Sequence, residues 1–286
     1  MHFHTFLTRR ALSTARPIPP GTIMAPGSGL GFWHQFGELH ALFNGGATAM
    51  TTGWRGLPVR SVGVSAGAVA LALVLLGVDF ESCFRSAQAS SLRINGSDEL
   101  SIIGSSRGRV LKVAEAWLED CVPKGLDGHP RELARMLHGL NVIVMTPDLR
   151  HVSLTAPGTP SLDDSQPPAL QSRQDLIDAL IAAISIPYLL TKTPRALRNG
   201  YSGFDALRYD PGVAHLRVDA KPMRSACPHA AIQMYESGWA RGMEKAEQGA
   251  LCPTACRRDI AEPLPYGVSP VWRSVRTLLL NKVEPP

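Results

Sequence analysis

Acidic residues are absent from the first 37 positions of the chain, although three arginines fall there. An acid-free start that contains arginine and serine is typical of an organellar transit peptide, and equally of an ordinary disordered or strand-forming N-terminus. We therefore expect residues 1–20 to form a separate N-terminal segment. We expect an intracellular location, either cytoplasmic or organellar. Peripheral association with a membrane surface stays open. The early apolar run is too short for a secretory signal.

The basic excess is small once the N-terminal arginines are set aside. The net charge is +5, from 29 basic and 24 acidic residues. Without the three early arginines, 26 basic residues face 24 acidic ones. A nucleic-acid-binding surface needs a concentrated basic patch, so the composition predicts no nucleic-acid partner.

Cysteines are few and irregularly spaced. The count of five is odd, which does not fit a disulfide framework. Cys252 and Cys256 have the spacing of two metal ligands, but a structural zinc site needs four, and no second Cys or His pair has a matching spacing. We expect reduced thiols and no metal.

Long apolar runs are also scarce. The longest, at 62–78, has 17 mostly apolar residues with a serine near its start. A transmembrane helix needs about 20 such residues. A buried helix explains the run more simply, and we expect no transmembrane span. With 44% hydrophobic and 19% charged residues, the chain has enough apolar material for a sizeable core.

Two strand–turn–helix units stand in the first quarter of the chain. "GTIMAPGSGLGFWHQFGELHALFNGG" predicts a short strand, a glycine-rich turn and a helix from about Phe32 to Phe43. "LPVRSVGV" predicts a strand that ends at Ser65, directly before the apolar helix. This alternation is typical of an α/β fold with a parallel sheet.

The rest of the chain continues the mixed pattern. Helical periodicity predicts helices in "GRVLKVAEAWLEDCV", "RELARMLHGL", "SRQDLIDALIAAISI", "HAAIQMYESGWARGMEKAEQG" and "SVRTLLLNK". Ser172 is placed to cap the third of these helices. "NVIVMTPDLRHVSLTA" predicts a pair of strands. No linker is long enough to divide the chain, so we expect residues 21–286 to form a single α/β domain with a C-terminal helical extension.

Ser65 is the first candidate functional residue, because Gly63 to Gly67 spell G-x-S-x-G. A nucleophilic serine needs exposure at a sharp turn, a base, and hydrogen-bond donors for the oxyanion. A turn between strand and helix provides the first, and the two glycines let the backbone bend tightly. The alternative is a serine that only caps the following helix.

A second glycine cluster, Gly27-Ser28-Gly29, lies in the first strand–helix turn. On neighbouring parallel strands, its N–H groups would lie near Ser65 and form an oxyanion hole. A dinucleotide loop is the alternative, but it requires glycine where Phe32 stands and an acid in "TAMTTGWRG", which has none. A nucleotide-binding α/β protein is therefore a weaker hypothesis.

Four blocks of the sequence resemble the patatin-like phospholipase domain. "APGSGLGFWHQFGELHAL" followed by "VGVSAGAVAL" is similar to that family's glycine-rich oxyanion loop and its G-x-S-x-G turn. "NVIVMT" resembles its central strand, and "DLIDALIAAISIPYLL" its helix and Ile-Pro step. "NGYSGFDAL" falls where the family has an Asp-Gly-Gly turn. The resemblance spans roughly Thr22 to Asp210.

The resemblance implies a three-layer patatin-like sandwich, with a central, mostly parallel sheet flanked by helices. It also implies a lipase- or phospholipase-like hydrolase in which a Ser–Asp dyad, without histidine, metal or organic cofactor, cleaves the acyl esters of lipids. The substrate would be a lipid or an ester at a membrane surface. The roles carried over are Ser65 as nucleophile, Asp205 as base, and the Gly27-Ser28-Gly29 loop as oxyanion hole, with Gly63 and Gly67 in the nucleophile elbow.

The sequence departs from the family's pattern in the oxyanion loop and at the proposed base. In the loop, Ser28 replaces the middle glycine and Gly31 stands where the family has a basic residue, but a backbone donor does not depend on a side chain. Asp205 is followed by Ala206 and Leu207 instead of two glycines. The second departure keeps an alternative open, in which the domain is catalytically inactive and binds lipid or a protein partner.

Overall fold

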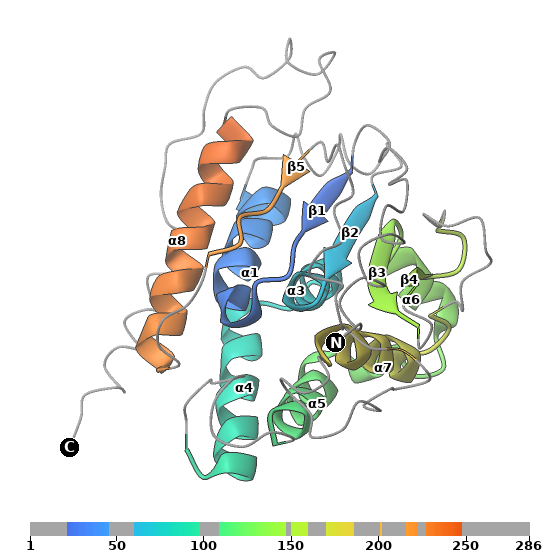
Figure 1. Cartoon of the computed structure of the whole chain (residues 1–286), viewed down its shortest axis with the longest axis horizontal. Coiled ribbons are helices and arrows are strands. Elements are labelled where there is room, and N and C mark those ends of the chain that lie inside the picture. Colours follow the sequence, from blue (N-terminus) through green and yellow to red (C-terminus); the bar gives the residue numbers. More distant parts are fainter. Residues whose placement is uncertain are drawn as a thin grey trace, which may run out of the picture.

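The computed structural model (Figure 1) describes residues 22–45, 60–97, 109–146, 150–159, 170–185, 201, 216–221 and 227–247. The strands are β1 (Ile23–Ala25), β2 (Ser61–Val64), β3 (Leu140–Met145), β4 (His151–Thr155) and β5 (Leu216–Arg217). The α-helices are α1 (Phe32–His40), α3 (Ala66–Leu75), α4 (Phe80–Asn95), α5 (Arg109–Cys121), α6 (Pro130–Met136), α7 (Arg173–Ile184) and α8 (Pro228–Glu247). The expected N-terminal segment 1–20 and the helix at "SVRTLLLNK" lie outside the described residues.

The strands form one mixed, mostly parallel sheet in the order β4-β3-β2-β1-β5. β1 is parallel to both β2 and β5, β2 is parallel to β3, and β4 is antiparallel to β3. This arrangement confirms the α/β class predicted from the strand–helix alternation. In the register of β1 and β2, Ala25 pairs with Gly63. The two strands therefore end side by side, and the turns that follow them begin at the same edge of the sheet.

The longest apolar run of the sequence is shared between β2 and α3. Nearly every residue of α3 is buried, as expected for a helix that is apolar on all sides. The helix has 10 residues and packs against α1, α7 and the strands β1 to β3. In the described part of the chain, no helix combines the length and the apolar character that crossing a membrane would require.

An aromatic cluster joins α1 to α4 and α5. The ring of Phe32 stands edge-on to those of Trp33 and Trp117, with centroids 5.0 and 5.1 Å away. Trp33 also meets Phe84 on α4, at 5.6 Å. Because Phe32 and Trp33 are 2% and 4% exposed, they belong to the core. The sequence pattern did not predict α4, although Asp79 caps it by accepting from the N–H of Ser82.

Helix α8 packs along α1 (Figure 1), although the two helices are far apart in the sequence. A glycine permits the close approach. A Cβ atom at Gly238 would fall on the carbonyl of His34 and 2.9 Å from the N atom of Glu38. The backbones of the two helices therefore touch at this point. The close approach lets Lys245 on α8 reach Glu38 on α1.

The other elements predicted within the described residues are also present. Ser172 caps α7 by accepting from the N–H of Asp175, whose carboxylate in turn accepts from the N–H of Ser172. β3 and β4 form the expected strand pair. α1 ends earlier than predicted, at His40, and continues as one wider turn over Ala41–Gly45.

Candidate active site

Ser65 occupies the turn between β2 and α3 in a strained backbone conformation. Its φ and ψ angles are 51° and −127°, and it is the one residue other than glycine with positive φ among those described. Such a conformation costs about 1–3 kcal/mol and persists only where the surrounding structure enforces it. A nucleophile elbow also holds its serine at a strained strand–helix turn, and for this reason Ser65 is kept as the candidate nucleophile.

The helix-capping alternative for Ser65 does not fit the geometry. Ser65 stands at the N-cap position of α3, but its side chain makes no capping hydrogen bond. Its backbone carbonyl accepts from the N–H of Ala68 at 3.0 Å. The hydroxyl is therefore free of the helix that follows it, and it lies at the positive end of that helix's dipole.

The two glycines of the motif are required by close packing. A Cβ atom at Gly67 would lie 2.6 Å from the carbonyl oxygen of Pro26 and closer still to that of Ala25. A Cβ atom at Gly63 would lie 2.9 Å from the Cβ atom of Ala68. The first turn of α3 therefore lies directly against the end of β1, where the glycine-rich turn starts.

The predicted oxyanion loop follows β1 at this point. Gly27, Ser28 and Gly29 are half-buried, and Gly29 has a φ of 53° that favours glycine. Within the described residues, no hydrogen bond engages the N–H groups of these three residues. The turn therefore offers backbone donors beside the helix that begins after Ser65.

The predicted base, Asp205, lies outside the described residues. Tyr201 is the described residue nearest to Asp205 in the sequence, and it is half-buried against the core. The role of Asp205 therefore remains a prediction.

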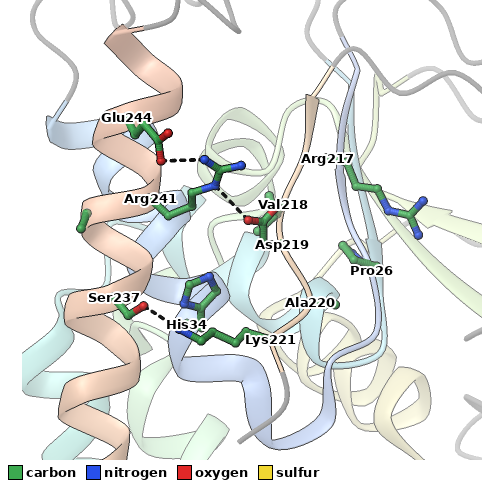
Figure 2. Close-up of a pocket in the computed structure, with 11 residues that line it drawn as sticks. Pro26, His34, Arg217, Val218, Asp219, Ala220, Lys221, Ser237, Arg241 and Glu244 are labelled. Atoms are coloured by element: carbon green, nitrogen blue, oxygen red, sulfur yellow. Dashed lines mark hydrogen bonds and ion pairs between the residues drawn. The ribbon is translucent and has the colours of Figure 1, made fainter.

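A separate open groove, with a volume of about 750 Å³, lies between α1, α8 and the segment after β5 (Figure 2). Pro26 forms part of its wall, so the groove reaches the start of the glycine-rich turn. Arg241 on α8 donates to Asp219 at 3.0 Å and to Glu244 at 2.6 Å (Figure 2). Lys221 donates to the Ser237 hydroxyl at 3.0 Å. Sequence reasoning missed the groove because its residues come from three distant segments.

A buried ion-pair network lies beside this groove. Lys245, 7% exposed, donates to Glu38 at 2.5 Å, to Asp219 at 2.8 Å and to the carbonyl of Arg217 at 2.8 Å. Burial raises the pKa of the Glu38 carboxyl, and Lys245 opposes this effect. Burial would also raise the pKa of Asp219, but the hydrogen bonds from Lys245 and Arg241 hold it below its ordinary value.

The same network resembles a metal site in its geometry. Ligand atoms of His34, Glu38 and Asp219 lie within 4.8 Å of one another. However, the Lys245 ammonium already bonds to both carboxylates, so a metal ion there would face an adjacent positive charge. The cluster is explained by the chain's own cation. Burial and the nearby Lys221 charge lower the pKa of His34, which favours the neutral ring.

Ser65 and the groove are different places, and Ser65 is the stronger candidate for the active site. The acidic groups of the groove and the network are paired with the chain's own arginine and lysine residues, which accounts for them structurally. Ser65 has a strained backbone and a hydroxyl that does not cap its helix, and no capping or pairing role accounts for it among the described residues. Comparisons with protein-family models, with curated proteins and with solved structures find no match to this chain.

Proposed function

We propose that this chain is a serine acyl hydrolase of the patatin-like type, which cleaves acyl esters of lipids. Ser65 is the nucleophile, Asp205 the base, and the Gly27–Gly29 turn the oxyanion hole. The observation that carries the proposal is the backbone of Ser65, whose φ of 51° places it in a strained strand–helix turn without a capping role. The patatin-like sandwich belongs to the same proposal and is supported by the mostly parallel sheet.

In the proposed reaction, the Oγ atom of Ser65 attacks the ester carbonyl while Asp205 accepts the proton of the Ser65 hydroxyl. The negative charge that develops on the carbonyl oxygen is stabilised by the N–H groups of the glycine-rich turn and by the N-terminus of α3. The alcohol of the substrate leaves with the proton, which produces an acyl-enzyme. Asp205 then takes a proton from water, which attacks the acyl-enzyme, and the proton passes to the Ser65 oxygen as its bond to the acyl group breaks and the fatty acid is released. The mechanism requires no metal or organic cofactor.

The second candidate function is an inactive domain of the same fold that binds lipid or a protein partner. It is favoured by one sequence observation, namely that Ala206 and Leu207 follow Asp205 where the family has glycines. An aspartate displaced by two residues along a strand end moves roughly 6–7 Å, beyond hydrogen-bond reach of the Ser65 hydroxyl.

A fluorophosphonate probe distinguishes the two functions, because it labels only an activated serine. We expect the wild-type protein to be labelled and to hydrolyse a short-chain ester, and Ser65→Ala to do neither while remaining folded. Ser237→Ala is the matched control, since it removes a hydroxyl from the groove, and it should behave as the wild type. An unlabelled, folded wild-type protein would favour the inactive domain. Labelling that survives in Ser65→Ala would place the nucleophile elsewhere.

A further inference from the structure

Gln35, on the first turn of α1, binds two points of the glycine-rich turn. Its side chain is fully buried. The Nε2 atom donates to the carbonyl of Pro26 at 2.8 Å, and the Oε1 atom accepts from the hydroxyl of Ser28 at 2.7 Å. One rigid amide group therefore joins the residues on either side of Gly27.

The chemistry of the partners sets the orientation of this amide. Pro26 has a carbonyl and no N–H, so it can only accept, and the NH₂ group of Gln35 must face it. The Gln35 oxygen is then left for Ser28, whose hydroxyl must be the donor. Both ends of a buried amide are satisfied in this arrangement, whereas an unpaired end would cost about 1–3 kcal/mol.

We infer that Gln35 and Ser28 form a clamp that positions the N–H groups of the glycine-rich turn for the oxyanion. The inference rests on the proposed function and deepens it. Ser28 has a φ of −130°, which any residue adopts, so the backbone does not require glycine there. The side chain that replaces the family's glycine is instead used to hold the turn. Gln35 is thus a positioning residue, and it acts through the loop without touching the substrate.

The first test replaces Gln35 with methionine, which has a similar length and no hydrogen-bonding amide. Loss of a single oxyanion donor lowers kcat about 10²–10³-fold, and we expect a loosened turn in Gln35→Met to lower it at least ~10-fold with KM nearly unchanged. Gln174→Met is the matched control, because Gln174 is exposed on α7 and its amide binds only Asp178 within the described ranges. It should retain wild-type kinetics.

A second variant, Gln35→Glu, supplies a readout that a purely structural role would not produce. The neutral carboxylic acid can donate to Pro26 and accept from Ser28, as the amide does, whereas the carboxylate cannot donate. Burial opposite a carbonyl raises the pKa of such a carboxyl. The activity of Gln35→Glu relative to the wild type should therefore increase as the pH falls. The activity of Gln35→Met relative to the wild type should not change with pH.

Amide hydrogen exchange tests the clamp without relying on activity. The N–H of Gly31, which donates to the carbonyl of Ser28 across the turn, should exchange faster in Gln35→Met than in the wild type, while α7 exchanges at the same rate in both. Unchanged exchange, or unchanged kcat in an active protein, would overturn the clamp and leave the proposed function intact. A wild-type protein that no fluorophosphonate labels would overturn the proposed function, and with it the catalytic purpose of the clamp.

Discussion

The Nζ atom of Lys245 lies 2.5 Å from the Oε1 atom of Glu38, although the two residues are 207 positions apart. Glu38 is fully buried on α1, and Lys245 is nearly so on α8. Their pairing fixes the register of α8 against α1. The loop after β5 joins the same network through Asp219. Its carboxylate accepts from Lys245, and its backbone N–H donates to the carboxylate of Glu38.

Lys245→Met should destabilise the fold strongly. It leaves the buried Glu38 carboxylate without its lysine partner, whereas Asp219 keeps Arg241. Breaking a buried ion pair costs about 3–5 kcal/mol. Chemical denaturation measures the loss. Arg241→Met removes a more exposed partner of Asp219 and should change stability little. If Lys245→Met were as stable as the wild type, the pair would not hold α8 in place. The double variant Glu38→Gln/Lys245→Met should recover part of the loss, since the buried Glu38 charge is then also removed.

His40 should make stability depend on pH. Its Nε2–H donates to the carbonyl of Val78, and its Nδ1 accepts from the Tyr235 hydroxyl, each at 2.9 Å. Burial lowers the pKa of His40 to about 4, below its ordinary 6.5. The unfolded chain therefore binds a proton that the folded chain does not. The contribution of His40 is complete above pH 6.5 and falls by about 3 kcal/mol as the pH drops to 4.

Denaturation at pH 7 and pH 4.5 checks this dependence. His40→Gln removes the titrating group and should lose less stability between the two pH values than the wild type does. His138→Gln is the control, because His138 is exposed, and it should follow the wild type. An equal loss in His40→Gln and the wild type would mean that other groups cause the acid sensitivity.

Ser65→Gly should be more stable than Ser65→Ala. Alanine keeps the strain of a positive φ at this turn, whereas glycine adopts positive φ freely. We expect a difference of about 1 kcal/mol in the free energy of unfolding. Both variants lack the hydroxyl, so its loss does not contribute to the difference that thermal denaturation measures. Equal stabilities would argue that the turn at Ser65 relaxes in solution.

Gly67→Ala should disrupt the junction of α3 with β1. The added Cβ atom meets the backbone of Ala25 and Pro26, which cannot move aside as a side chain can. Overpacking of this kind costs about 1–3 kcal/mol, and we expect the upper end. Gly125→Ala is the control, since a Cβ atom there meets nothing within 4 Å. A fully stable Gly67→Ala protein would contradict the close approach of the two elements.

Asp205→Asn tests the proposed base. Loss of general-base catalysis lowers the rate at least ~10²-fold, and fluorophosphonate labelling should slow in parallel. Asp210→Asn provides a neighbouring control and should retain activity. An experimental structure should place an Asp205 carboxylate oxygen within roughly 3–4 Å of the Ser65 Oγ atom. Full activity in Asp205→Asn would assign the base to another residue.

The sequence by itself determined the local features of the fold. Two strand–turn–helix units, the strand pair β3–β4 and the cap of α7 were predictable, because hydrophobic periodicity and capping residues act over a few positions. The same reasoning placed Ser65 at the turn between a strand and a helix. Helix α4 was missed even though Asp79 and Gly96 stand at its two ends as caps.

Only the tertiary structure decided which distant residues meet. The strained φ of Ser65, the hold of Gln35 on Pro26 and Ser28, and the pairing of Glu38 with Lys245 follow from the path of the backbone, which no local pattern encodes. A buried glutamine or glutamate looks the same in the sequence as an exposed one. Its partners become fixed only when the core closes around it, because a buried polar group is stable only when it is hydrogen-bonded.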